Sequence, residues 1–220
     1  MERINDFTGL LLVVMAISVL PFVAMVVTSY AKIVVVLGLL RNALGVQQVP
    51  PNMVLNGVAI LVSAYIMAPI GFNAMNTMQR QENGGNSAGG TTQLVLNAVG
   101  SAREPFRQFL QKHAKEREIR FFLRSATAIW PKEQADALTR NDLMVLAPAF
   151  TLSELTDAFK IGFLLYIAFI VVDLIIANVL LAMGLNQVTP TNIAIPFKLL
   201  LFVVMDGWST LLHGIVLSYR

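Results

Sequence analysis

Four long apolar segments constrain this chain more than any other feature, and they cover roughly residues 7–40, 53–75, 161–183 and 193–217. A helix needs about 20 apolar residues to cross a hydrocarbon core of about 30 Å, and the last three segments have that length. Only 13% of the residues are charged, whereas a typical soluble domain carries about 25%. The sequence therefore predicts an all-α membrane protein with about four long hydrophobic helices in two hairpins.

The first apolar segment is too long for one simple span. At about 1.5 Å per residue it would reach about 50 Å as a single helix. Pro21 lies inside it, and proline removes one helical hydrogen bond and clashes with the preceding turn. We expect a broken helix at that point. The segment is also too long for a secretory signal peptide, so the N-terminus is expected to be that of the mature chain.

A polar stretch separates the two pairs of apolar segments. It opens with QENGGNSAGGTTQ, residues 81–93, a composition typical of flexible linkers. At its end, Thr151-Leu-Ser-Glu154 matches a capping box and predicts the start of a long helix that ends near Met183. The predicted organisation is an N-terminal hydrophobic hairpin, a polar, partly flexible, small helical domain and a C-terminal hydrophobic hairpin, over residues 1–78, 79–152 and 153–220.

Several function classes lack the residues that they need. The chain has no Cys, which excludes disulfides, thiolate catalysis and Cys-ligated metals. Its two His are a hundred residues apart in sequence, which leaves little for a zinc site. Basic residues never cluster without acids beside them, so nucleic acid is a poor candidate partner. We expect no enzyme activity, no metal and no cofactor.

Charges in the short loops suggest a topology. The loop 41–52 carries Arg41 and no acid, with Lys32 shortly before it, and the loop 184–198 carries Lys198 and no acid. The positive-inside rule then places both loops in the cytoplasm and the termini and the polar stretch outside. Pro50-Pro51 is expected to stop one helix and start the next.

Three ionisable residues lie in or at the edge of the C-terminal apolar segments: Asp173, Lys198 and Asp206. Such groups are costly in a spanning segment unless they are paired or hydrated. They could form a proton or ion relay, or they could be buried ion pairs with Lys198 or Lys32 of the same or a neighbouring subunit. The chain offers no series of His or Tyr between the acids, which favours ion pairs.

The turn GLNQVTPTN, residues 184–192, is a second irregular point at membrane depth. Irregular backbone there is tolerated where it is buried in protein or lines a water-filled cavity. Several copies of this turn around an axis would form a constriction. From spacing alone, an ordinary turn of a helical hairpin is the favoured interpretation.

Three long runs in this order resemble one family. They are LGLLRNALGVQQVPPN at 37–52, TLSELTDAFKIGFLLYIAFIVVDLIIANVLLAMG at 151–184 and IPFKLLLFVVMDGW at 195–208. Together they resemble the SctR/FliP family, whose members are R-type export-gate subunits of type III secretion systems (YscR/HrcR-like) and of flagella. The resemblance covers nearly the whole chain except the Gly/Asn linker and parts of the polar domain.

The resemblance implies a multi-pass protein of the bacterial inner membrane with a periplasmic portion. It implies a pore-forming structural subunit of the type III protein secretion export gate, a homo-oligomer (a pentamer in the family) that passes unfolded secreted proteins. The implied partners are S-type and T-type gate subunits, the U-type and V-type export apparatus proteins, and membrane lipid. A separate ATPase and the proton motive force supply the energy, so the subunit itself catalyses nothing.

The resemblance also implies a role in the pore for the turn after Met183. Flagellar relatives have a run of methionines here that seals the pore, and methionine is soft enough to yield to a passing chain. This chain has Leu185, Asn186 and Gln187 instead. The resulting hypothesis is that Leu185 forms an apolar ring, with Asn186 and Gln187 as a polar rim. Arg41, Lys32, Asp173, Lys198 and Asp206 are expected to form inter-subunit or buried ion pairs.

Three alternatives stay open. The chain could be the flagellar homologue. Flagellar members often carry a cleavable signal sequence, whereas none is expected here, and this difference favours an injectisome subunit involved in virulence. It could be a small proton-coupled secondary transporter with Asp173 and Asp206 as coupling sites, although no internal repeat supports this. It could also be a membrane scaffold without a pore.

Overall fold

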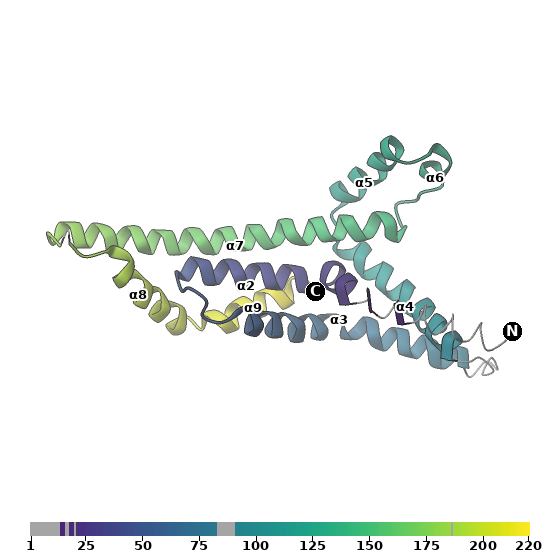
Figure 1. Ribbon diagram of the computed structural model, residues 1–220, viewed down its shortest axis with the longest axis horizontal. Helices are drawn as coiled ribbons and strands as arrows, with labels where there is room; N and C mark the ends of the chain where they lie inside the picture. The colour runs from purple at the N-terminus through teal and green to yellow at the C-terminus, as the bar shows by residue number, and fades with distance from the viewer. Residues whose placement is uncertain (1–13, 16–17, 20, 83–90, 186) are drawn as a thin grey trace. The chain divides into compact units, whose positions relative to one another are not determined.

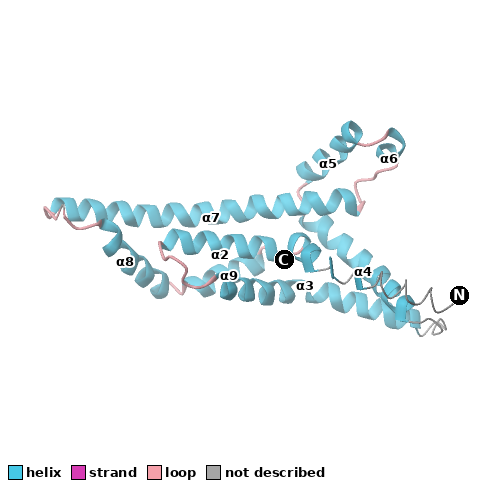
Figure 2. Cartoon of the chain, in the orientation of Figure 1, coloured by secondary structure: helices cyan, strands magenta, loops and turns pink. Residues whose placement is uncertain are grey.

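The protein folds as helices joined by loops (Figures 1 and 2), in a computed structural model that describes residues 14–15, 18–19, 21–82, 91–185 and 187–220. No β-strand occurs in those ranges. A short helical run covers Pro21–Val27. The labelled helices are α2 Tyr30–Leu44, α3 Asn52–Glu82, α4 Thr91–His113, α5 Glu116–Ile129, α6 Lys132–Asp136, α7 Leu143–Ala182, α8 Pro190–Val204 and α9 Gly207–Leu217.

The chain divides into two compact units, each made of two stretches of sequence. The first unit comprises Met1–Ala31 and Ala64–Glu154, and the second comprises Lys32–Ser63 and Leu155–Arg220. The long helices α3 and α7 each contribute one part to each unit.

The core of the first unit lies where α4, α5 and the start of α7 meet. Its buried members are Leu110, Ile119, Val145, Leu146, Ala149 and Phe150, and Phe106, Phe109, Phe122 and Leu123 pack against them. The ring centroids of Phe109 and Phe150 lie 5.5 Å apart, with the two rings tilted relative to each other. The backbone N–H of Lys115 donates to Ser153 Oγ at 2.9 Å, which ties the α4–α5 connection to α7. Apolar burial and one specific hydrogen bond thus hold this helical unit together.

The second unit packs α2 against α7, α8 and α9. Leu40 and Leu44 of α2 are buried with Phe202 of α8, and Phe169 and Leu211 pack on them. Helices α2 and α7 approach each other closely at Gly162. A Cβ added to Gly162 would lie only 2.2 Å from Leu39 Cδ1. Only glycine at residue 162 lets the two helices come this near.

The connection between α2 and α3 agrees with the prediction from Pro50-Pro51. Helix α2 ends at Leu44, and Gly45 follows with a φ of 76°, a left-handed conformation in which glycine commonly ends a helix. The peptide bond between Val49 and Pro50 is cis, and α3 begins at Asn52. The double proline therefore separates two helices, as the sequence predicts.

The helices are long and apolar enough to cross a membrane. Helix α7 and the stretch Asn52–Thr77 of α3 each qualify alone. Two bent pairs qualify if each is taken as one span, namely Pro21–Val27 with α2, and α8 with α9, which are bent by 61°. These four elements correspond to the four apolar segments, and they confirm the prediction of an all-α membrane protein in which some helices are broken.

The first segment is broken at Thr28-Ser29, between the helical run Pro21–Val27 and α2. The predicted break at Pro21 borders residue 20, which lies outside the described residues. The predicted start of the long helix was wrong. The long helix begins at Leu143 and runs through the supposed capping box at Thr151. Thr151 Oγ1 donates to the carbonyl of Ala147 one turn earlier instead of capping a helix start. A hydroxyl inside a helix can bond back in this way, so the motif alone does not fix a boundary.

Candidate functional site

A buried lysine joins three helices of the second unit. Lys198 of α8 is 5% exposed, and its Nζ lies 2.6 Å from Asp173 Oδ2 on α7. The same Nζ donates to the carbonyl of Ala43 at 3.2 Å. Ala43 belongs to the last turn of α2, where carbonyls lack helical partners and a cation is favoured by the helix dipole. Lys198 therefore fixes the end of α2 against α7 and α8.

The ion pair borders a cavity of about 380 Å³ in the same unit. Asn42, Tyr166 and Thr191 add polar groups to its lining, together with the apolar side chains of Ile170, Leu174 and Ile195. The Asp173 side chain is 43% exposed, in contrast to that of Lys198 at 6%. The carboxylate is thus the accessible partner of the pair, and the ammonium is the buried one.

The other predicted ionic residues lie elsewhere in this unit. Arg41 Nη1 donates to the carbonyl of Pro50 at 3.2 Å and to Asn52 Oδ1 at 2.6 Å, so it holds the loop between α2 and α3. Lys32 is buried, and its Nζ lies 4.2 Å from the ring centroid of Tyr219, within the range of a cation–π interaction. Tyr219 could not be predicted as this partner, because the contact follows from the tertiary arrangement alone.

Asp206 stands apart from these contacts. It is exposed and lies at the bend between α8 and α9, with a φ of 48°. A non-glycine residue in this left-handed region is uncommon, and aspartate is one of the residues that tolerate it best. The structure thus places the two acids in different settings, Asp173 beside a lysine and Asp206 at an exposed break.

The predicted constriction residues lie in the turn that follows α7. Met183, Leu185 and Gln187 are all exposed, whereas Asn186 lies outside the described residues. Gly184 has a φ of 74°, a left-handed backbone conformation that glycine adopts without steric cost. The turn therefore presents two apolar side chains on either side of a required glycine.

Leu185 also helps to terminate α7. Its backbone N–H donates to the carbonyl of Leu180 at 3.0 Å, and the N–H of Gly184 donates to the carbonyl of Leu181 at 3.0 Å. This pair of bonds defines a Schellman motif with glycine in the left-handed position. Leu180 is buried with Ile176 and Ala194, so the motif is anchored on the packing of α7 against α8.

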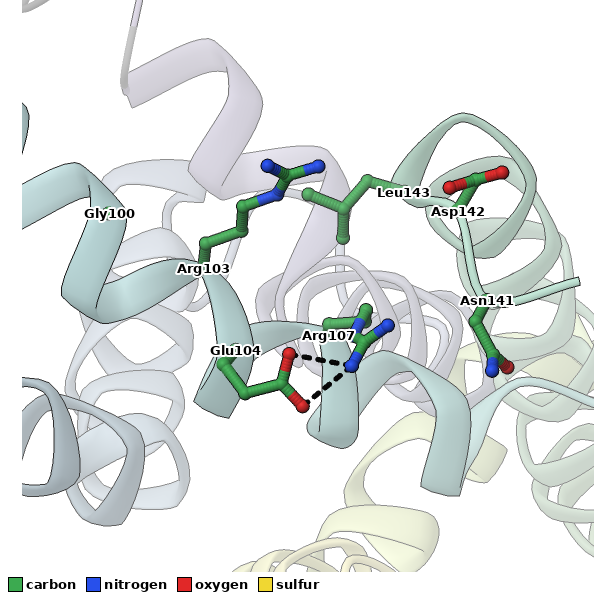
Figure 3. A pocket seen from close by; sticks show the side chains of 7 residues that line it. All are labelled: Gly100, Arg103, Glu104, Arg107, Asn141, Asp142 and Leu143. Carbon is green, nitrogen blue, oxygen red and sulfur yellow. Dashed lines mark hydrogen bonds and ion pairs between the residues drawn. The ribbon is translucent and has the colours of Figure 1, made fainter. Parts of the chain in front are cut away.

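A separate polar cleft lies in the first unit, between the C-terminal half of α4 and the start of α7 (Figure 3). Arg107 Nη2 pairs with Glu104 at 2.7 Å, and Gln108 Nε2 donates to the same carboxylate at 3.0 Å. Asp142 Oδ2 accepts bonds from the N–H and the hydroxyl of Thr139. Both carboxylates of the cleft are thus satisfied within the unit.

These contacts shift the acid–base equilibria of the cleft. Hydrogen bonds from Arg107 and then Gln108 lower the pKa of the Glu104 carboxyl. The backbone and hydroxyl bonds from Thr139 lower the pKa of Asp142, with a further contribution from the charge of Arg103. The hydrogen bond and charge of Glu104 raise the pKa of Arg107. Both carboxylates of the cleft therefore stay ionised at neutral pH.

No group of three or more His, Cys, Asp or Glu that could hold a metal ion occurs among the residues that the structure describes. The features that stand out are instead an ion pair between two apolar helices, broken apolar helices and an exposed apolar turn. They define the class of the chain as an all-α membrane protein with candidate spans built from long or bent helices.

Comparison with known proteins narrows this class to a family. The model of the FliP family matches residues 12–215, so the chain belongs to the FliP family. It is 67% identical to "Pathogenicity-related ORF2" of Xanthomonas campestris pv. glycines, over 96% of both chains. It is 64% identical to "Hypersensitivity response secretion protein HrcR" of Ralstonia nicotianae, over 98% of both chains. It is 47% identical to "Yop proteins translocation protein R" of Yersinia pestis, over 100% of this chain and 99% of the relative.

Proposed function

We propose that this chain is a structural, pore-forming subunit of a type III protein secretion export gate in the bacterial inner membrane. The observation that carries the proposal is the match to the FliP family over residues 12–215. Relatives named for secretion and translocation match over nearly their whole lengths, which adds support. In this role the chain conducts unfolded secreted proteins and performs no catalysis.

The names of the relatives favour a virulence-type gate over the flagellar one. The printed names refer to pathogenicity, the hypersensitivity response and Yop translocation. We therefore place this chain with the injectisome subunits. Its oligomer would be a ring, joined by S-type and T-type gate subunits and by the U-type and V-type apparatus proteins. The polar domain over residues 79–152 would face the periplasm.

Within such a ring, the turn after α7 would form the constriction. Met183 and Leu185 are exposed by 63% and 40%, which leaves their apolar surfaces available to neighbouring copies or to a passing chain. Gln187 is exposed in the same turn, and Asn186 is included from sequence alone. Leu185 would supply the apolar seal, because apolar side chains around a narrow axis exclude water and ions.

A conductance experiment tests this role. In cells that assemble the gate, Leu185→Gly should increase the leak of small ions, because it removes the apolar ring but leaves the N–H that bonds to Leu180. Leu185→Met is the matched control, since a methionine of similar size keeps the seal. An unchanged ion barrier in Leu185→Gly, with normal amounts of assembled gate, would refute the constriction.

The transporter alternative makes a different demand on the same unit. A transporter needs Asp173 to bind and release a coupling proton. The cavity beside Asp173 is the observation that supports this alternative. Proton-coupled solute uptake by the purified chain in vesicles, abolished by Asp173→Asn, would favour a transporter. Secretion that is restored by this chain in a strain lacking its own R-type subunit would favour the gate.

A further inference from the structure

A basic groove runs along the exposed face of α5 in the first unit. Arg117, Arg120, Phe121, Arg124, Ser125 and Ala128 line it, and its volume is about 530 Å³. The three arginines are spaced three and four residues apart, which places them on one face of the helix. The only carboxylate that pairs with them in the described chain is Glu118, which lies 2.8 Å from Arg117 Nη2. The groove therefore keeps an excess of positive charge.

Its side chains are those expected of a protein interface. Phe121 is 56% exposed between the arginines, and the groove contains no lysine. Arginine and aromatic residues are enriched at interface centres, whereas lysine is depleted there. Arg120 Nε donates to the carbonyl of Glu116. The guanidinium group of Arg124 makes no hydrogen bond or ion pair within the described residues, although its backbone carbonyl accepts a bond from Thr127 Oγ1. Their terminal guanidinium nitrogens are thus available to bind carboxylates in pairs.

The same unit carries a complementary acidic element. Nearly every carboxylate whose side chain is described in this unit has a partner: Glu104, Glu116, Glu118, Asp142 and Glu154. The two exceptions among those described side chains are Glu133 and Asp136, which are exposed on α6. They lie three residues apart, about 5–6 Å between Cβ atoms, and this matches the spacing of Arg120 and Arg124.

We propose that the basic groove of α5 in one copy of this chain receives α6 of a second copy. Glu133 and Asp136 of one copy would pair with Arg124 and Arg120 of the next, with Phe121 covered between them. Such a contact joins two different surfaces, so it is head-to-tail and closes into a ring when the rotation allows. The inference rests on the proposed function, because it names the surface through which the proposed oligomer forms.

Cysteine cross-linking tests the contact directly, because the natural chain contains no Cys. Two differently tagged copies would be co-expressed, one with Arg124→Cys and the other with Glu133→Cys, and membranes would be oxidised. A head-to-tail contact predicts a cross-linked dimer that carries both tags, and little cross-linking when either variant is expressed alone. Lys112→Cys in place of Arg124→Cys is the matched control, since Lys112 is an exposed cation of α4 outside the groove.

Charge exchange provides an independent measurement. Arg124→Glu or Glu133→Arg alone should lower the assembled fraction several-fold, and the two changes in one chain should restore it. The natural contact should also weaken with added salt, because exposed charge pairs are screened. The contact is refuted if the wild-type ring is intact but the mixed cross-link is absent, or if Lys112→Cys cross-links equally well. A wild-type chain that forms no oligomer at all refutes the proposed function as well, so the two failures can be told apart.

Discussion

The close approach of α2 and α7 leads to a quantitative prediction for Gly162→Ala. An added Cβ would lie 2.2 Å from Leu39 Cδ1 and 2.8 Å from Leu39 Cβ, whereas carbon atoms in contact prefer about 3.5–4.0 Å. A new rotamer of Leu39 can move Cδ1 but not Cβ, which is fixed to the backbone. The two helices must therefore move apart, and overpacking of this kind costs about 1–3 kcal/mol.

Gly38→Ala is the matched control, because a Cβ there meets nothing within 4 Å. Both substitutions gain about 1 kcal/mol of helix propensity, so the difference between them isolates the overpacking. We expect Gly162→Ala to be less stable than Gly38→Ala by about 1–3 kcal/mol. For a chain of this size, that difference corresponds to about 2–4 °C in Tm for each kcal/mol.

The assay is thermal unfolding of both variants purified in the same detergent. Adding Leu39→Ala to Gly162→Ala removes Cγ and Cδ1 but keeps the Cβ contact, so it should restore only part of the loss. A partial recovery of Tm in the double variant would show that the loss depends on the contact with Leu39 and is not a general effect of Gly162→Ala. Equal Tm values for Gly162→Ala and Gly38→Ala would show that α2 and α7 do not meet at Leu39, and they would refute the packing of the second unit.

Three further predictions concern polar contacts. Asp173→Asn should destabilise the chain more than Lys198→Met does, because it leaves a buried charge unpaired at a cost of up to about 3–5 kcal/mol; equal losses in Tm would contradict the assignment of Lys198 as the buried partner. Arg41→Met should increase amide hydrogen exchange in the loop 45–51, because both hydrogen bonds to that connection are lost; unchanged exchange would show that Arg41 does not hold the loop. The bonds from Thr139 lower the pKa of Asp142, so they stabilise the folded state above the unfolded pKa of about 3.9 and lose this effect as the pH falls through the lower folded value. Tm measured from pH 5 downward should therefore fall more steeply in the wild type than in Asp142→Asn, and parallel curves would contradict this contribution.

The sequence predicted the helical elements well where a single strong signal governs them. The apolar runs gave the candidate spans, since their length follows directly from the thickness of a bilayer. Pro50-Pro51 marked the end of one helix and the start of the next, because neither proline can donate a helical hydrogen bond. These features depend on the local chain alone.

Signals that depend on distant partners were misread or invisible. The run Thr151–Glu154 lies inside α7, which begins at Leu143, and is therefore not a helix cap. The hydroxyl of Ser153 instead accepts a bond from Lys115, 38 residues away. The acids were expected to pair with Lys198 or Lys32, and only the fold selects Lys198 for Asp173. The carbonyl of Ala43 and the ring of Tyr219 carry no signal in sequence, because any residue has a carbonyl and a lone tyrosine has many uses.

The arginines of the α5 groove were a signal that sequence reasoning passed over. Arg117, Arg120 and Arg124 recur at helical spacing, and this spacing alone predicts a common face. What the sequence could not supply is the hollow they line and the exposure of Phe121 within it. Both depend on which face of α5 packs on the core of the first unit.

The measurement that tests the central claim most directly is native mass spectrometry of the detergent-extracted protein. The chain would be expressed alone and then together with candidate S-type and T-type subunits from the same secretion system. An export-gate subunit predicts a discrete ring of this chain that gains mass when those partners are present. A monomer or a simple dimer that does not bind the partners would contradict the account. That result would favour the transporter alternative, in which Asp173 and the cavity beside it form the coupling site.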